Sequence, residues 1–208
     1  MTTITLLHTS DAHVPTFQAL QTRLAPDCTL VQIVRSDWLA QAQHHGLSDP
    51  LRQEIADIVK EARGTVICTC TTIGPAAVDA GAIRVDAPMM ERAAITGGTV
   101  LLAYALESTK DTSTELLKSA LAAQGQDQDI RHLFCGTLWP LFTAGEFAAF
   151  VNGIAKAVER AILENDVDCV VLAQASMADA APLLSHLNVP VFASPESAML
   201  FALERKTI

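Results

Sequence analysis

The amino-acid sequence predicts an α/β protein built from two similar halves, each a parallel sheet flanked by helices. Three observations predict this class. Short runs alternate with longer segments of helical period, the short runs are continuously apolar, and no low-complexity linker interrupts the pattern. Strands separated by such helices form βαβ units, and strands buried on both faces are continuously apolar. Half of the 208 residues are apolar, enough for one large domain or two lobes of about 100 residues.

The strands are assigned to the short apolar runs bounded by polar or turn residues. They are expected at Thr3–His8, Thr29–Val34, Thr65–Cys70, Ile83–Asp86, Val100–Tyr104, Ile130–Phe134, Cys169–Ala173 and Pro190–Ala193. The helices are assigned to the segments in which apolar residues recur with helical spacing. They are expected at Val14–Leu24, Leu51–Arg63, Met89–Ile95, Thr112–Ala123, Gly145–Glu164, Ala178–His186 and Glu196–Glu204.

A repeated pattern of strands and helices within the sequence predicts the two halves. The strand from Val66 ends in small polar residues and is followed by helix, strand and helix, and the strand from Val170 is followed in the same way. The match is one of pattern and not of identity, so coincidence is the alternative. Gly97 and Gly98 break the chain near its middle. We therefore predict a first lobe at 1–95, joined by the C-terminal segment 192–208, and a second lobe at 96–191.

Charge and composition exclude several classes of function. The chain has 14 Lys and Arg against 23 Asp and Glu, a net charge of −9, and the basic residues are scattered. Nucleic-acid binding needs clustered basic residues, so no nucleic-acid partner is expected. No run reaches the roughly 18–20 apolar residues of a membrane span, and the N-terminus lacks the basic head of a signal peptide. We therefore expect a cytoplasmic protein without a membrane partner, and no glycine fingerprint of a nucleotide site occurs.

The five cysteines do not form a disulfide or metal pattern. Their number is odd, and Cys68 and Cys70 are separated by one residue with no second Cys or His pair nearby. We therefore expect no metal site. A lone cysteine in a strand is most simply a small buried apolar residue.

Cys70 is the exception that the sequence singles out. The chain continues from it as Thr71-Thr72-Ile73-Gly74-Pro75, and Pro75 suits the first turn of a helix. A thiol between a strand end and a helix start is stabilised as thiolate by the unpaired amides, which lowers its pKa and makes it a usable base or nucleophile. The same amides could hold a carboxylate. Simple packing is the alternative, and it suits Cys68 better.

In order along the chain, five segments resemble the aspartate/glutamate/hydantoin racemase superfamily. They are Leu6–Thr9, the Cys70–Thr72 turn, the helix entry Val85–Glu91, the threonine-rich loop Ala105–Thr112 and the strand Val170–Met177. The likeness runs over nearly the whole chain. It implies two pseudo-symmetric lobes with the active site in the cleft between them, and chemistry without pyridoxal phosphate, metal or nucleotide.

The resemblance also implies roles for individual residues. In the family's racemases, two cysteines lie on opposite faces of the substrate's α-carbon, and one removes the proton while the other delivers one. Cys70 matches the first of them. The residues implied to bind the substrate carboxylate are Thr9, Thr71, Thr72, Thr109 and Thr112. Hydroxyls at the last two positions could also cap the following helix.

The sequence departs from the family at two places. The second cysteine would fall at Gln174, in a segment without a thiol. We assign Gln174 and Ser176 to the catalytic set as hydrogen-bond donors on the opposite wall, with Ala175 as a substrate-binding neighbour. Where amino-acid racemases have Asp-Ser, this chain has His8-Thr9. His8 is assigned to substrate binding and could act as a proton shuttle, or it could simply bond a backbone carbonyl.

These features predict a cofactor-independent, racemase- or isomerase-like enzyme. It would use a thiol for proton transfer at the α-carbon of a small carboxylate or hydantoin-like substrate. One alternative is a decarboxylase of substituted malonates, because a single thiol suits protonation on one face. The other alternative is a non-catalytic protein that binds small carboxylates. Lobes with apolar helices commonly associate, so a homo-oligomer is expected.

Overall fold

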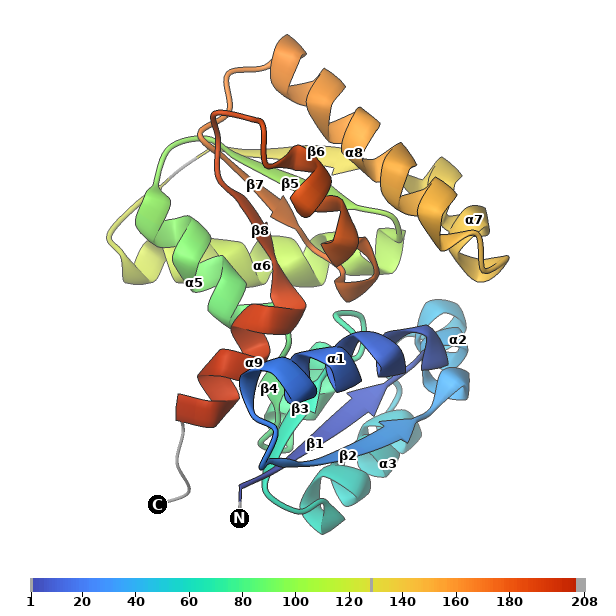
Figure 1. Ribbon diagram of the computed structural model, residues 1–208. Helices are drawn as coiled ribbons and strands as arrows, with labels where there is room; N and C mark the ends of the chain where they lie inside the picture. The colour runs from blue at the N-terminus through green and yellow to red at the C-terminus, as the bar shows by residue number, and fades with distance from the viewer. Residues whose placement is uncertain (1, 128, 205–208) are drawn as a thin grey trace. The chain divides into compact units, whose positions relative to one another are not determined.

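Eight strands form two four-stranded parallel sheets in the computed structural model, which describes residues 2–127 and 129–204 (Figure 1). The first sheet has the order β2 (Thr29–Val34), β1 (Thr3–His8), β3 (Thr65–Cys68) and β4 (Ile83–Arg84). The second has the order β6 (Ile130–Phe134), β5 (Val100–Tyr104), β7 (Cys169–Leu172) and β8 (Val191–Ala193). Every strand pair is parallel. The predicted α/β class with two like sheets is confirmed.

The helices follow the strands in the βαβ manner. The α-helices are α1 (Val14–Leu24), α2 (Ser36–His45), α3 (Asp49–Glu61), α4 (Gly74–Asp79), α5 (Ala87–Thr96), α6 (Glu107–Ala123), α7 (Trp139–Thr143), α8 (Phe147–Glu164) and α9 (Ser194–Glu204). Short 3₁₀ helices are η1 (Asp11–His13), η2 (Gly136–Leu138), η3 (Ala175–Ala180) and η4 (Pro182–Leu184).

The chain divides into two compact units. Unit 1 comprises the residues up to Ala87 and those from Pro195 onward, and unit 2 is Pro88–Ser194. The division falls after Ala87, the first residue of α5, whereas the sequence suggested a break near Gly97. The physical reason is that Met89 and Met90 of α5 are fully buried in the core of unit 2. Residues 205–208 of the predicted C-terminal segment lie outside the described residues.

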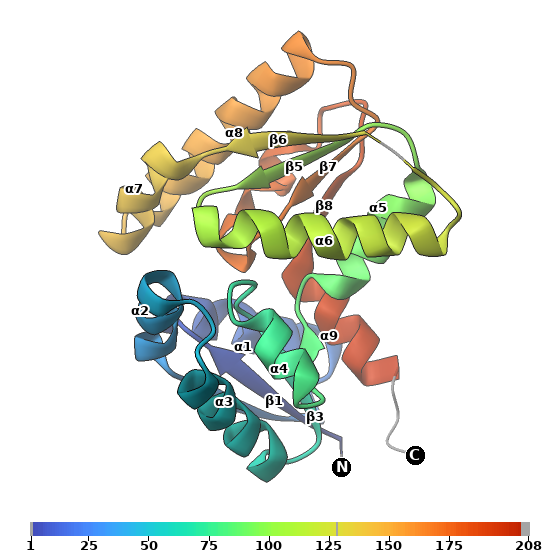
Figure 2. The ribbon, with the colours of Figure 1, turned by 180° about the vertical axis from the view of Figure 1, so that it is seen from behind.

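In unit 1, helices cover both faces of the sheet. Phe17 of α1 and Met199 of α9 pack with Ile4 and Ile67 on one face. Helices α2, α3 and α4 cover the other face, where Trp38 and neighbouring apolar side chains contact the strands (Figure 2). Both faces of β1 and β3 are therefore shielded from solvent, and polar groups that could bind a ligand lie at the strand ends.

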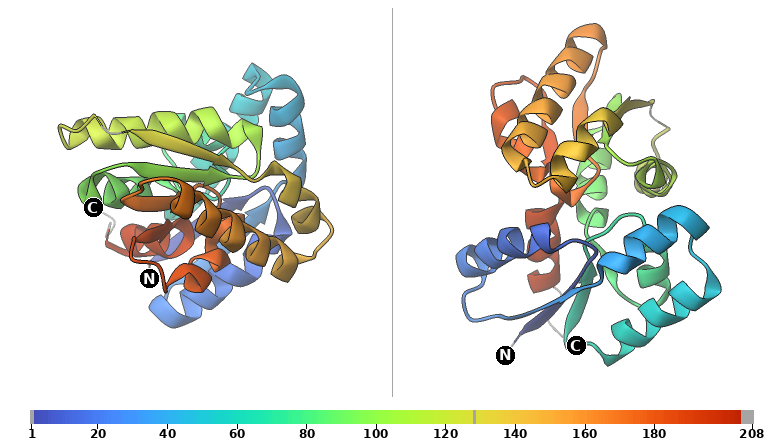
Figure 3. Two further views of the ribbon diagram at one scale, coloured as in Figure 1. Left: turned by 90° about the horizontal axis from the view of Figure 1, so that it is seen from above. Right: turned by 90° about the vertical axis from the view of Figure 1, so that its right-hand side faces the viewer.

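Unit 2 repeats this layering. Phe150 and Ile154 of α8 pack against Leu101 and Leu172 on one face of the sheet. Leu117 of α6 packs with α5 on the other face. Figure 3 shows α6 and α8 on opposite sides of these strands.

Several element ends differ from the expectations. β3 ends at Cys68, so Cys70 lies beyond the strand and not at its last residue. α6 begins at Glu107, well before Thr112. The segment expected as one helix at Ala178–His186 forms two 3₁₀ pieces, because Pro182 lacks the N–H that a continuous α-helix needs. Helix α2, which was not among the expected helices, ends in an exposed turn that contains His44.

Candidate functional site

The carboxyl ends of β1 and β3 bring the first group of candidate residues together in unit 1. These strands are neighbours, with Leu7 paired with Cys68, and the amide of Thr69 donates to the Leu7 carbonyl at 3.0 Å. Cys70 lies two residues beyond the end of β3. Ligands of parallel α/β sheets bind beyond the carboxyl ends of the strands. The sequence therefore placed Cys70 and Thr9 at the edge where such a site forms.

Cys70 is the one cysteine of the five that is not buried. Burial raises the pKa of the Cys68 thiol strongly, and it raises the pKa of Cys135 and of Cys169 to about 11. These thiols are held protonated at neutral pH, which confirms the expectation that Cys68 packs. Cys70 alone has the partial access that thiol chemistry requires.

The residues after Cys70 form a tight turn, which we call the Cys70 turn (residues 69–73). The amide of Gly74 donates to the Thr71 carbonyl at 3.2 Å, and α4 begins at Gly74 with Pro75 in its first turn. The Cys68 thiol donates to the Cys70 carbonyl at 3.4 Å from inside the sheet. Thr71 and Thr72 are nearly buried. Pro75 thus lies in the first turn of a helix, as the sequence predicted, and this helix is only six residues long.

His8 lies in the core at the end of β1. Its side chain is fully buried, its Nδ1 is 2.8 Å from Thr69 Oγ1, and its Nε2 is 3.0 Å from the Gln32 carboxamide. The Thr69 hydroxyl donates to the Leu7 carbonyl. Burial lowers the pKa of His8 to about 4, so the ring is neutral near pH 7, and the Gln32 atom that faces its Nε2 is the carboxamide oxygen. The role of His8 in substrate binding stays a prediction.

His13 is a residue that the sequence analysis did not single out. It ends η1, just after β1, and its ring centroid lies 6.3 Å from that of His8. Burial, with the nearby His8 ring, lowers the pKa of His13 to about 4. Ser10 caps the short helix by accepting from the Ala12 amide. A Ser-Asp-x-His string has no periodicity, so no pattern pointed to this histidine.

Unit 2 contains the position that matches Cys70. Leu172 pairs with Ala103 as Cys68 pairs with Leu7, and the next amide in each unit bonds the same carbonyl. Two residues beyond the strand, the matching residue is Gln174. Its Oε1 accepts from the amides of Ala105 at 2.6 Å and Leu106 at 3.1 Å. Gln174 therefore holds the connection between β5 and α6 in place.

The remaining unit 2 candidates lie near this connection or beside Gln174. Thr109 is fully buried in the first turn of α6, and the Thr112 hydroxyl donates to its carbonyl at 3.1 Å. The N-cap is Leu106, without a side-chain cap, so the expected capping by the hydroxyls does not occur at that position. Ala175 is buried. The Ser176 hydroxyl is buried and has no partner within the described part of the chain.

A buried ion pair beside the Cys70 turn is the second feature that the sequence analysis missed. Arg84 and Asp86 are both nearly or fully buried, with Nη2 of Arg84 2.6 Å from Oδ2 of Asp86. Asp86 directly precedes α5, a position typical of a helix cap, but its carboxylate binds the guanidinium.

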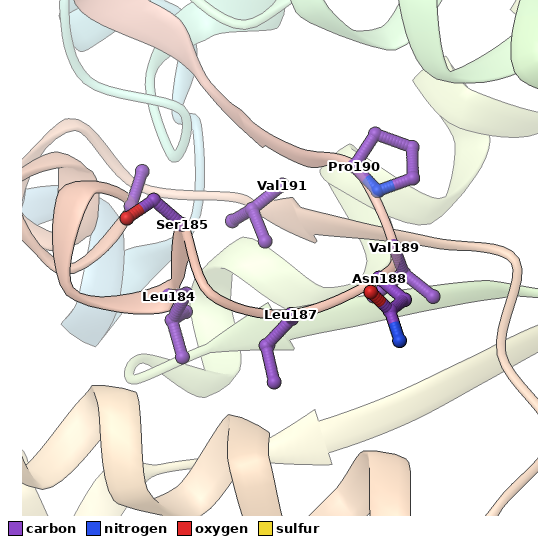
Figure 4. Close-up of a pocket in the computed structure, with 8 residues that line it drawn as sticks. Leu184, Ser185, Leu187, Asn188, Val189, Pro190 and Val191 are labelled. Carbon is purple, nitrogen blue, oxygen red and sulfur yellow. The ribbon is translucent and has the colours of Figure 1, made fainter.

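A surface depression of about 430 Å³ lies elsewhere in unit 2 (Figure 4). It is formed by the loop between η4 and β8. Its lining residues are Ala181, Leu184, Ser185, Leu187, Asn188, Val189, Pro190 and Val191. This loop enters β8 at its amino end, away from the carboxyl ends that carry the candidate residues, and the lining holds no charged group.

Within residues 2–127 and 129–204, no group of three or more His, Cys, Asp or Glu side chains is arranged to hold a metal ion. In the same ranges, no helix is long and apolar enough to cross a membrane.

The fold is similar to that of several solved enzymes. A glutamate racemase of Bacillus anthracis is 15% identical, with a TM-score of 0.69 over 98% of this chain and 81% of that one. An allantoin racemase of Klebsiella pneumoniae is 17% identical, with a TM-score of 0.65 over 98% and 87%. An arylmalonate decarboxylase is 19% identical, with a TM-score of 0.60 over 97% and 91%. No protein-family model and no curated protein sequence matches the chain. The chain thus shares the fold of these racemases and of the decarboxylase.

Proposed function

We propose that this protein is a cofactor-independent enzyme that transfers a proton at the α-carbon of a small carboxylate or hydantoin-like substrate, with Cys70 as the acid/base. One observation carries the proposal. The only cysteine that is not buried follows β3 at the sheet's carboxyl edge, in a chain with the fold of racemases and a decarboxylase. The likeness in fold supports the reaction class, and the placement of the thiol supports the role of Cys70.

In this reaction the Cys70 thiolate would take the α-proton and leave an enolate. Hydrogen-bond donors must stabilise the enolate oxygens, because the α-proton of a carboxylate is weakly acidic. Thr9, Thr71 and Thr72 would supply such donors in unit 1, and Thr109 and Thr112 are the candidates in unit 2. Return of a proton by the same thiol would re-form the substrate with its α-hydrogen exchanged, whereas inversion of the α-carbon would require a second acid on the opposite face.

A decarboxylase is the second candidate, and the match between Cys70 and Gln174 favours it. A carboxamide does not exchange a proton near neutral pH, so this pair of positions offers one acid and not two. In decarboxylation of a substituted malonate, the C–C bond to the leaving carboxylate breaks and CO₂ departs. The electron pair left on the α-carbon then takes the proton of the Cys70 thiol. One acid on one face is sufficient for that step.

Proton NMR in D₂O tests the proposal. The wild-type protein and the Cys70→Ser variant would be incubated with aspartate, glutamate, hydantoins and substituted malonates. We expect loss of an α-proton signal, or formation of a deuterated monoacid, that disappears in Cys70→Ser. The matched control is Cys28→Ser, which changes a buried thiol in a core cluster of unit 1 away from the Cys70 turn and should retain turnover. Binding of these carboxylates without exchange in the wild type would contradict the enzyme and indicate a binding protein.

A further inference from the structure

The buried ion pair of unit 1 lies against the Cys70 turn. Both Nε and Nη2 of Arg84 bind the Asp86 carboxylate, at 2.9 and 2.6 Å. Such a two-point contact fixes the plane of the guanidinium as well as its position. Arg84 is paired with Cys68 in the parallel ladder between β3 and β4, and Asp86 follows it by two residues, in the turn that leads into α5.

The arginine side chain also contacts the start of α4. A Cβ placed on Gly74 would lie 3.0 Å from Nε and 3.2 Å from Cδ of Arg84. The Arg84 side chain therefore packs directly against Gly74, the residue that follows the Cys70 turn. From the sheet side, the Cys68 thiol binds the Cys70 carbonyl. The turn is held between these two contacts.

Unit 2 has a position that matches Arg84 but no thiol at the position that matches Cys70. Leu172 pairs with Ala193 as Cys68 pairs with Arg84. A small neutral residue therefore stands in unit 2 where unit 1 has the arginine. Two like sheets thus differ at two matching places, with Cys70 and Arg84 in one and Gln174 and Ala193 in the other.

Stability alone does not account for this difference. The free energy needed to desolvate two charges often exceeds the free energy gained from their attraction. A protein with apolar residues of similar size in place of a buried ion pair is often equally stable. What the bidentate pair adds is a fixed geometry. Among the described residues, the bidentate buried pair occurs in the unit that contains the partly accessible Cys70 thiol.

We propose that Arg84 and Asp86 are positioning residues that hold the Cys70 turn in its reactive conformation. The inference rests on the proposed function for its catalytic purpose. The placement of the turn can be measured without any substrate. A displacement of about 1 Å at a reacting group can cost about a hundredfold in rate, so a rigid support for a catalytic thiol has a large effect.

The first test is site-resolved thiol labelling of the native protein with iodoacetamide, read by mass spectrometry. Arg84→Lys keeps the positive charge but cannot make the two-point contact with Asp86. Asp86→Asn removes the negative charge of the pair. Gly74→Ala adds a Cβ that displaces the Arg84 side chain without changing any charge. We expect each to raise the labelling rates of Cys70 and Cys68 by about tenfold or more through local opening. Cys28 packs in the other core cluster of unit 1, so its labelling rate should not change.

The matched control is Arg52→Met. It breaks the exposed Arg52–Asp79 pair at the other end of α4 and should leave all labelling rates unchanged. Unchanged labelling of Cys68 and Cys70 in all three test variants would overturn the proposal. A parallel rise in the labelling rate of Cys28 in all three variants would also overturn it, because that pattern indicates general unfolding of unit 1.

The second test is kinetic and separates this proposal from the proposed function. Once a substrate is found, Arg84→Lys should lower kcat by about a hundredfold and change KM little, since the thiol is misplaced and the carboxylate donors remain. Local labelling changes without any Cys70-dependent exchange in the wild type would support the placement of the turn and contradict the enzyme. Cys70-dependent exchange with unaltered kcat and labelling in the variants would support the enzyme and overturn the positioning role.

Discussion

At the scale of single residues, the buried His8 network sets a pH dependence of folding. His8 is neutral in the native state because burial lowers its pKa from 6.5 to about 4. The unfolded chain binds a proton near pH 6.5, whereas the native chain does so only near pH 4. Between these values the unfolded state binds more protons, so stability falls as the pH falls.

We therefore predict that His8 alone makes the free energy of unfolding roughly 3 kcal/mol smaller at the lower end of this pH window than above it. Urea unfolding of the wild type and of His8→Asn across the window measures this. The variant should show a clearly shallower pH dependence, although it loses the bonds to Thr69 and Gln32. His44→Asn, at an exposed position of α2, should keep the wild-type dependence. Equal slopes for wild type and His8→Asn would show that folding does not lower the pKa of His8.

The sequence predicted the residues at the sheet edge better than it predicted their partners. Cys70 and Thr9 follow apolar runs, so their positions at strand ends were visible. The Thr69 and Gln32 contacts of His8 span 61 and 24 positions of the chain, and only the strand register brings them together. Arg84 looked like an ordinary charge at the end of a short strand. Its burial depends on the missing side chain of Gly74.

At the scale of elements, strands were easier to predict than helices. Strands buried on both faces leave an unbroken apolar run, and four of the eight match the structure at both ends. Helix α2 was missed because it is short and mixes buried Trp38 with several exposed polar residues. The early start of α6 at Glu107 was missed because its stabilising contact is distant. Gln174, two residues beyond the end of β7, holds the two amides just before the helix.

The link between β4 and α4 leads to a stability prediction. Asp86→Ala leaves the Arg84 guanidinium buried without its counter-charge, so we expect a loss of about 3–5 kcal/mol in the free energy of unfolding. Asp79→Ala removes the partner of Arg52 at the exposed end of α4, and we expect a loss of about 0–1 kcal/mol. Urea denaturation of both variants measures the difference. Similar values for the two would mean that the Arg84 charge finds another partner or reaches solvent.

At the scale of the whole molecule, the two units share strand order and register while their strand ends carry different chemistry. The order of β1–β4 in the first sheet is repeated by β5–β8 in the second. The repeated pattern of strands and helices in the sequence made two such halves predictable. The division between them was not, because Met89 and Met90 follow unit 1 in the chain and are buried in unit 2. The position of an active site between the lobes stays a prediction.

The single acid of the proposed mechanism leads to a prediction about stereochemistry. With an enantiopure substrate in D₂O, removal and return of the proton by Cys70 on one face exchanges the α-proton while the configuration is retained. We therefore expect deuterium incorporation to outpace inversion in the wild type, as measured by chiral chromatography with mass detection. Inversion as fast as exchange would contradict the one-acid mechanism, because it requires a second acid on the other face.

The same argument predicts a gain of function in Gln174→Cys. A thiol at the position that matches Cys70 would supply the second acid, so inversion should rise toward the rate of exchange. The change also removes the acceptor of the Ala105 and Leu106 amides, and leaving them unpaired should cost about 1–3 kcal/mol of stability. Gln174→Ser is the matched control, since it loses the same acceptor without gaining a thiol. If Gln174→Ser raises inversion equally, the effect comes from the loosened β5–α6 connection. If only Gln174→Cys does so, and Cys70→Ser abolishes the effect, the two matching strand ends act as the two faces of one reaction.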